Sequence, residues 1–93
     1  MPKPKSTEFM IKFVQDYLDG ASSRLDWDLD FNHYLILHYP KMERENPDVA
    51  DCFAFYLSEN GFDCAESLSD EEHRLFIRKQ FDLFHDTLKS GLL

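Results

Sequence analysis

The chain has 93 residues, of which 43% are hydrophobic and 30% are charged, and this composition suffices for a single folded domain with one core. Its net charge is −8, from 18 acidic and 10 basic side chains, so electrostatic repulsion disfavours direct binding to nucleic acid or to an anionic membrane. No apolar run approaches the roughly 20 residues that cross a bilayer, and the N-terminal MPKPKSTEF lacks the apolar segment of a secretory signal, which predicts a cytoplasmic protein.

The first predicted helix covers residues 7–19. It follows the proline-broken stretch MPKPK, residues 1–5, which we expect to be a disordered lead-in. Ser6 or Thr7 is predicted to be the N-cap, because a side-chain oxygen there can accept a hydrogen bond from a free amide of the first turn. Apolar residues recur at helical spacing: Met10, Phe13, Val14, Tyr17 and Leu18. Gly20 is predicted to end the helix.

The second predicted helix covers residues 28–39. The sequence RLDWDLD, residues 24–30, leads into it with an aspartate at every second position. Asp28 or Asp30 is predicted to cap this helix, where a carboxylate meets the positive end of the helix dipole. Apolar side chains cover nearly every side of the helical wheel, which predicts burial on most sides: Leu29, Phe31, Tyr34, Leu35, Ile36, Leu37 and Tyr39. Pro40 is predicted to end the helix, because it disfavours helical geometry in the residue before it.

An alternative structure for residues 25–39 is a short hairpin, because LDWDLDF alternates apolar and polar side chains with the period of a strand. This hairpin would make the fold α+β. Its turn would be Asn32-His33, which lacks the glycine that tight hairpins prefer, and the following HYLILHY does not alternate. The helix is therefore favoured.

The third predicted helix has the clearest start signal in the chain. Asn46 is a favoured N-cap and Pro47 a favoured first helical residue, which predicts a helix over residues 47–60. Its apolar stripe consists of Val49, Ala50, Phe53, Ala54 and Leu57. Asn60-Gly61 is expected to end it with a residue in left-handed geometry.

The fourth predicted helix covers residues 69–89. Ser69 and Glu72 have the spacing of a capping box, in which side chain and backbone bond reciprocally at a helix start. Four helices with connections this short predict an all-α fold, a compact four-helix bundle that makes residues 6–93 a single helical domain.

Asp26, Asp28 and Asp30 have the spacing of the first three ligands of a calcium loop. That loop needs a glycine at its sixth position, where this chain has Phe31, and a glutamate at its twelfth, where it has Leu37. A calcium site is therefore not predicted.

Three Asp-x-x-His pairs place a carboxylate and an imidazole one helical turn apart: Asp30 with His33, Asp70 with His73, and Asp82 with His85. Di-metal helical bundles use Glu-x-x-His pairs together with further glutamates that point inward. The glutamates here fall at helix ends and in polar turns. We predict no metal site, and a small metal-dependent helical bundle remains an alternative reading of the chain.

The sequence contains no pattern typical of an enzyme. It has no Gly-x-Ser-x-Gly elbow, phosphate-binding glycine loop or dinucleotide fingerprint, and only three glycines from which to make one. Cys52 and Cys64 match no metal or redox spacing and are expected to be reduced thiols. We predict no enzymatic activity, no catalytic residue and no cofactor.

The leading functional hypothesis is a non-enzymatic protein-binding module, such as a small acidic inhibitor, adaptor or regulatory subunit. Aromatic side chains make up 15% of the chain, which predicts a dense core with some rings left to contact a partner. The predicted partner-binding residues are Asp26, Trp27, Asp28, Asp30, Asp63, Glu66, Asp70, Glu71 and Glu72. Trp27 would anchor another protein that has a basic surface. An alternative is an acidic mimic of nucleic acid that blocks a DNA-binding protein.

Five basic side chains could form a local basic face: Lys41, Arg44, Arg74, Arg78 and Lys79. We interpret them as helix-surface charges that pair with acidic residues one turn away.

Overall fold

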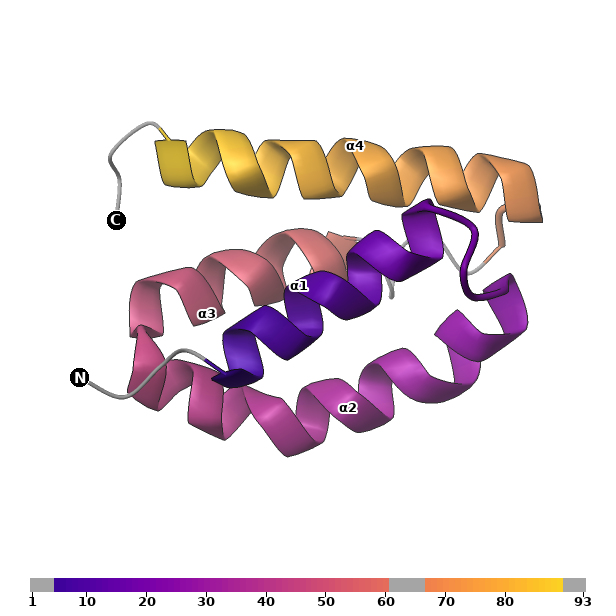
Figure 1. Ribbon diagram of the computed structural model, residues 1–93. Helices are drawn as coiled ribbons and strands as arrows, with labels where there is room; N and C mark the ends of the chain where they lie inside the picture. The colour runs from indigo at the N-terminus through magenta and orange to yellow at the C-terminus, as the bar shows by residue number, and fades with distance from the viewer. Residues whose placement is uncertain (1–4, 61–66, 90–93) are drawn as a thin grey trace.

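The computed structural model describes residues 5–60 and 67–89, and this part of the chain is all-α (Figure 1). Its segments are α1 (Lys5–Leu18), α2 (Arg24–Glu45), α3 (Pro47–Phe53), η1 (Ala54–Asn60) and α4 (Asp70–Lys89). α3 continues into η1, where the helix widens to π-helical turns. Successive helices run in alternating directions, and α1 and α3 lie between α2 and α4 (Figure 1). The predicted four-helix bundle is confirmed, and the alternative hairpin at 25–39 is wrong, because that segment lies within α2.

α2 begins four residues before its predicted start, so the prediction that Asp28 or Asp30 caps it is wrong. The N-cap is Ser23, whose hydroxyl oxygen accepts a hydrogen bond from the Asp26 amide at 3.1 Å. The Asp26 carboxylate accepts one in return from the Ser23 amide at 3.2 Å. This is a capping box that uses aspartate at the third helical position, where glutamate or glutamine is more usual.

α2 also continues past Pro40 to Glu45, so the predicted end at Tyr39 is wrong. A proline inside a helix removes one backbone hydrogen bond and costs about 3 kcal/mol. Contacts on both sides of it offset this cost. Met42 is fully buried in the core, and the Tyr39 hydroxyl donates a hydrogen bond to the Asp51 carboxylate at 2.7 Å. That hydrogen bond raises the pKa of Tyr39 to about 12.

The prediction that Ser6 or Thr7 caps α1 is wrong, because the cap comes from a side chain of α2. Both residues lie inside the first turn of α1 and are buried. The Glu45 carboxylate accepts hydrogen bonds from the Ser6 amide at 3.0 Å, the Thr7 amide at 2.9 Å and the Thr7 hydroxyl at 2.6 Å. Burial raises the pKa of Glu45, but these hydrogen bonds together hold it below its ordinary value. One side chain thus joins the start of α1 to the end of α2. The prediction that residues 1–5 are a disordered lead-in is wrong for Lys5, which is the first residue of α1, and residues 1–4 lie outside the described residues.

The predicted caps of α3 and α4 are confirmed. The Asn46 side chain accepts hydrogen bonds from the amides of Asp48 and Val49 at 3.1 and 3.3 Å. Ser69 and Glu72 form the predicted capping box, with the Ser69 hydroxyl accepting from the Glu72 amide and the Glu72 carboxylate accepting from Ser69. Local sequence patterns were sufficient at both places.

Aromatic rings form a continuous column through the bundle. Tyr17 of α1 contacts Trp27 of α2, with ring centroids 4.8 Å apart, and Trp27 stacks on Phe31 at 4.5 Å. Phe31 reaches Phe53 of α3 at 6.4 Å, and Phe53 meets Phe84 of α4 edge to face at 5.5 Å. These five rings are buried and each helix contributes to the column, so it holds the four helices together.

The interhelical cap predicts that Glu45→Ala lowers the free energy of unfolding by about 1–3 kcal/mol, because three buried or half-buried donors of α1 lose their acceptor. Chemical denaturation measures this change. Glu43→Ala is the matched control: Glu43 is exposed on the same turn of α2 and should change stability by less than about 0.5 kcal/mol. Equal effects of the two substitutions would contradict the cap.

The aromatic column predicts that Phe53→Ala lowers the free energy of unfolding by about 3–5 kcal/mol, because it empties a fully buried site in contact with Phe31 and Phe84. Phe55→Ala should cost less than about 1 kcal/mol, since the Phe55 side chain is 50% exposed. Urea titrations of both variants test the assignment. The reverse order would mean that the α3–η1 segment turns a different face to the core.

Candidate functional site

Arg24 joins the two acidic segments in which the partner-binding residues were predicted. Its guanidinium lies 3.3 Å from the Asp28 carboxylate and 3.7 Å from the Asp70 carboxylate, and it donates a hydrogen bond to the Leu68 carbonyl at 2.9 Å. The starts of α2 and α4 therefore meet at this side chain. Asp63 and Glu66, which were also predicted to contribute, lie outside the described residues.

Four of the six described carboxylates among the predicted binding residues already have structural roles. Asp26 and Glu72 cap their own helices, and the hydrogen bonds from Ser69 lower the pKa of Glu72. Asp28 and Asp70 share Arg24. The concentration of acidic residues at these helix starts thus has a stabilising role apart from any partner.

Trp27 does not fit the role of an interface anchor, because its side chain is fully buried. Its ring lies between Tyr17 and Phe31 in the aromatic column, and its indole nitrogen has no hydrogen-bond partner among the described residues. Because Trp27 and Phe31 are one helical turn apart, they face the core together. The prediction of an exposed anchor at this position is therefore wrong.

Several apolar side chains of α2 are exposed, although Trp27 on the same helix is buried. Leu25, Leu29 and Ile36 are 65%, 66% and 67% exposed, and their spacing places them on one side of the helix. Leu37, beside Ile36, is also more than half exposed. The prediction that this helix is buried on most sides is wrong, since its outer face has no neighbouring helix in the described structure. We call Leu25, Leu29 and Ile36 the α2 stripe.

A shallow apolar hollow of about 310 Å³ borders the α2 stripe. It is lined by Leu35, Ile36, Tyr39, Pro40 and Ala54, from α2 and the start of η1. The Tyr39 hydroxyl is the one polar group among these five side chains, and it donates a hydrogen bond to the Asp51 carboxylate. The hollow is suited to one apolar side chain from outside.

The histidines of the three Asp-x-x-His pairs do not converge. His73 is buried and its Nδ1 lies 2.6 Å from the Tyr17 hydroxyl, whereas His85 Nδ1 lies 2.9 Å from the Phe81 carbonyl of its own helix. His33 is exposed on α2. Within residues 5–60 and 67–89, no three His, Cys, Asp or Glu side chains are arranged to hold a metal ion.

Burial governs the chemistry of the Tyr17–His73 pair. Burial, followed by the nearby Arg24, lowers the pKa of His73 to about 4, so the imidazole is neutral at pH 7. Burial also raises the pKa of Tyr17, and the Arg74 guanidinium lies 4.9 Å from the centre of its ring. This pair is a neutral hydrogen bond inside the core and was not foreseen from the sequence.

Cys52 is a half-buried thiol, and burial raises its pKa, which reduces the thiolate fraction at neutral pH. Cys64 lies outside the described residues, so the expectation that both cysteines are thiols stays a prediction.

Comparisons with protein-family models, with curated proteins and with solved structures found no significant match to this chain. In the described part of the chain, no helix combines the length and apolar content needed to cross a bilayer.

The neutral His73 predicts that stability falls with acidification before the carboxylates titrate. The unfolded chain binds a proton at this histidine near pH ~6.5, whereas the folded chain does so only near its pKa of about 4, so stability is complete above ~6.5 and decreases below it. Between pH ~6.5 and ~5 the loss should be about 2 kcal/mol. His38, whose pKa is lowered by burial and by Lys41, adds to the same trend.

Urea titrations across this pH range measure the effect. His73→Gln should flatten the pH dependence, whereas His33→Gln, at an exposed position, should leave it unchanged. An unchanged slope in His73→Gln would show that His73 does not cause the acid sensitivity.

Proposed function

We propose that this protein is a non-enzymatic protein-binding module that docks a basic, amphipathic helix of a partner on the α2 stripe. The observation that carries the proposal is the exposure of Leu25, Leu29 and Ile36, each about two-thirds exposed on one side of a single helix. Single exposed leucines are ordinary on protein surfaces. Three that are aligned on one helix face have the spacing of anchors in helix-to-helix recognition.

The charge around the stripe supports a basic partner. Asp26, Asp28 and Asp30 alternate with the leucines, and Arg24 is the only basic residue among the first two turns of α2, which leaves this part of the helix net negative. The whole chain carries a charge of −8. Such a surface attracts cationic proteins and speeds their association, and it repels acidic ones.

The hollow beside Ile36 supports a helix as the bound element. An amphipathic helix that lies along the stripe presents apolar side chains at three- and four-residue intervals. One of these can enter the hollow formed by Leu35, Tyr39 and Pro40 while others cover Leu25 and Leu29. Contacts of this kind concentrate binding energy in a few buried apolar side chains.

The side chains with chemical reactivity support a binding role over catalysis. His73 is neutral and buried against Tyr17, and burial raises the pKa of the Cys52 thiol. Glu45 accepts three hydrogen bonds from α1 and caps that helix. Each of these groups has a structural use.

A synthetic amphipathic helix with one leucine face and one lysine face provides the test, with a scrambled peptide of identical composition as its control. The native protein should bind the amphipathic peptide more tightly, and binding should weaken as salt rises from about 0.05 M to about 0.5 M. Leu29→Gln combined with Ile36→Gln should weaken binding by at least about tenfold, because burying each side chain contributes roughly 1.5 kcal/mol or more. Fluorescence anisotropy measures these affinities.

Leu75→Gln is the matched control, since Leu75 is a similarly exposed leucine, 61%, on α4. It should leave binding unchanged, and melting curves should show that all variants fold. Equal affinity for the two peptides, or equal loss in the Leu75 variant, would overturn the proposal. Sedimentation that shows a dimer, dissociated by Leu29→Gln with Ile36→Gln, would also overturn it, because the occupant of the stripe would then be a second copy of the chain.

A further inference from the structure

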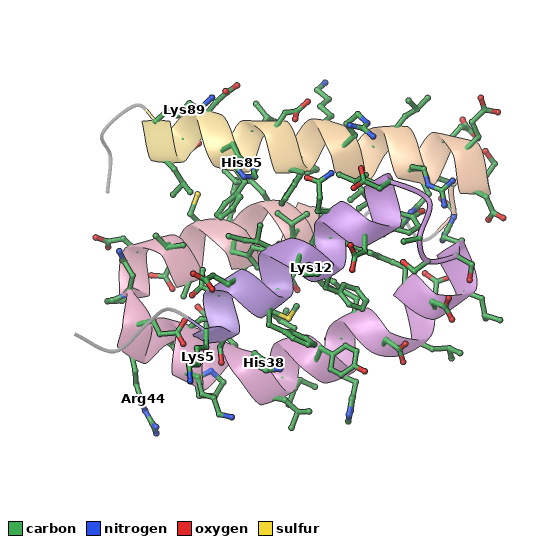
Figure 2. All side chains as sticks on the ribbon, in the orientation of Figure 1. Lys5, Lys12, His38, Arg44, His85 and Lys89 are labelled. Carbon is green, nitrogen blue, oxygen red and sulfur yellow. The ribbon has the colours of Figure 1, made fainter. Side chains whose placement is uncertain are left out.

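A second hollow, of about 630 Å³, lies where α1 begins and α2 ends. Its lining contains four basic side chains, an aromatic ring and two hydrogen-bonded polar residues: Lys5, Ser6, Phe9, His38, Lys41, Arg44 and Glu45. Figure 2 shows Lys5 of α1 together with His38 and Arg44 of α2 at this end of the molecule. We call this the basic hollow. Its position is independent of the α2 stripe and of the function proposed for it.

The cations of the basic hollow form no ion pair with the carboxylate beside them. Both oxygens of Glu45 are engaged by α1, through the amides of Ser6 and Thr7 and the Thr7 hydroxyl. Among the described residues, no ion pair joins Lys5, Lys41 or Arg44 to a carboxylate. The chain has 18 acidic residues and a net negative charge, so three unpaired cations around one hollow make its local charge opposite to that of the whole chain.

Phe9 gives the basic hollow an ordered aromatic surface. Its ring stacks on His38, with centroids 4.4 Å apart and an angle of 23°, and it meets Tyr34 edge to face at 5.2 Å. These two contacts hold the ring in place, yet the side chain remains 41% exposed. His38 is held in turn by a 3.0 Å hydrogen bond with the Ser6 hydroxyl.

We propose that the basic hollow binds a small phosphorylated molecule with a planar ring, of the nucleoside phosphate class. Lys5, Lys41 and Arg44 contact the phosphates, because ammonium and guanidinium groups bind multiply charged phosphate oxygens strongly. The planar ring of the ligand packs on Phe9. The volume of the hollow lies within the range of about 300–1,000 Å³ that is typical of small-molecule sites.

The net negative charge of the chain does not exclude this ligand. At physiological ionic strength, charges in water are screened over a distance of about 8 Å. The acidic N-terminal turns of α2 are separated from Lys41 by more than two helical turns, or more than about 11 Å. A phosphate in the hollow therefore interacts mainly with the cations that line it.

Titration calorimetry with three probes, without added divalent cation, tests the two halves of the site separately. Adenosine triphosphate carries both ring and phosphates, inorganic tripolyphosphate carries the phosphates alone, and adenosine carries the ring alone. The triphosphate should bind most tightly, tripolyphosphate more weakly, and adenosine weakest. No binding of the triphosphate at about 1 mM would overturn the proposal, since ordinary small-molecule sites saturate at or below that concentration. If tripolyphosphate and the triphosphate bind equally tightly, the proposed contact between the ligand ring and Phe9 is overturned.

Variants assign the binding to these residues. Lys41→Gln with Arg44→Gln should weaken binding of both phosphorylated probes by at least about tenfold, because two charge-assisted contacts are lost. Lys12→Gln with Lys79→Gln removes the same charge from exposed lysines outside the hollow and is the matched control. Phe9→Leu should weaken the triphosphate but not tripolyphosphate. Equal loss in the control variant would show that only the net charge matters and would overturn the site.

Magnetic resonance of the histidine rings locates the bound anion in the folded protein. The groups that face His38 are the Ser6 hydroxyl, the Phe9 ring, Lys41 and Glu45. Burial and Lys41 lower the pKa of His38, and an anion bound beside the ring should raise it. The ring resonances of His33, exposed on the same helix, should not shift when tripolyphosphate is added. An unchanged pKa of His38 at saturating tripolyphosphate would place the anion elsewhere.

Discussion

The stacking of Trp27 on Phe31 is the contact on which the rest of the structure depends. The two rings are buried one turn apart on α2, with centroids 4.5 Å apart and an angle of only 17°. Through them α2 contacts Tyr17 of α1 and Phe53 of α3. This packing decides the rotation of α2 about its own axis. It turns the side of α2 that carries Leu29 to solvent, and it thereby produces the α2 stripe.

The starts of α3 and α4 could be predicted because their determinants are local and use the usual capping residues. The caps at Asn46 and Ser69 depend on side chains within three residues of the helix start, and the sequence shows them directly. The α2 start was missed although its capping box is local, because Asp26 stands where glutamate or glutamine is more usual. The other errors arose where the determinant lies on another element. The cap of α1 is Glu45, on a different helix, and the continuation of α2 past Pro40 depends on tertiary contacts such as the burial of Met42. Local propensity at a proline predicts a helix end, and tertiary packing overrides it.

The candidate sites were predictable only in part, for a related reason. Apolar residues cover every side of α2 in the sequence, so periodicity cannot distinguish Trp27, which is buried, from Leu25 and Leu29, which are exposed. Only the positions of α1 and α3 decide which side is covered. The basic hollow was missed because it combines Lys5 with Lys41, from helices whose pairing the sequence does not show. Described members of the predicted acidic binding set do lie close together around Arg24, although most of their carboxylates stabilise helix starts.

Both proposed sites lie on α2, and their opposite charges follow from the electrostatics of one helix. The positive end of a helix dipole favours carboxylates such as Asp26, and the negative end favours cations such as Arg44. Glu45 also lines the hollow, but its oxygens accept hydrogen bonds from the amides of α1 and form no ion pair with Lys41 or Arg44. The placement of acidic residues at the start of α2 and basic residues at its end stabilises the helix, and it also keeps the two proposed binding sites apart. The start of α2 can attract a cationic protein, and its end can hold a small anion.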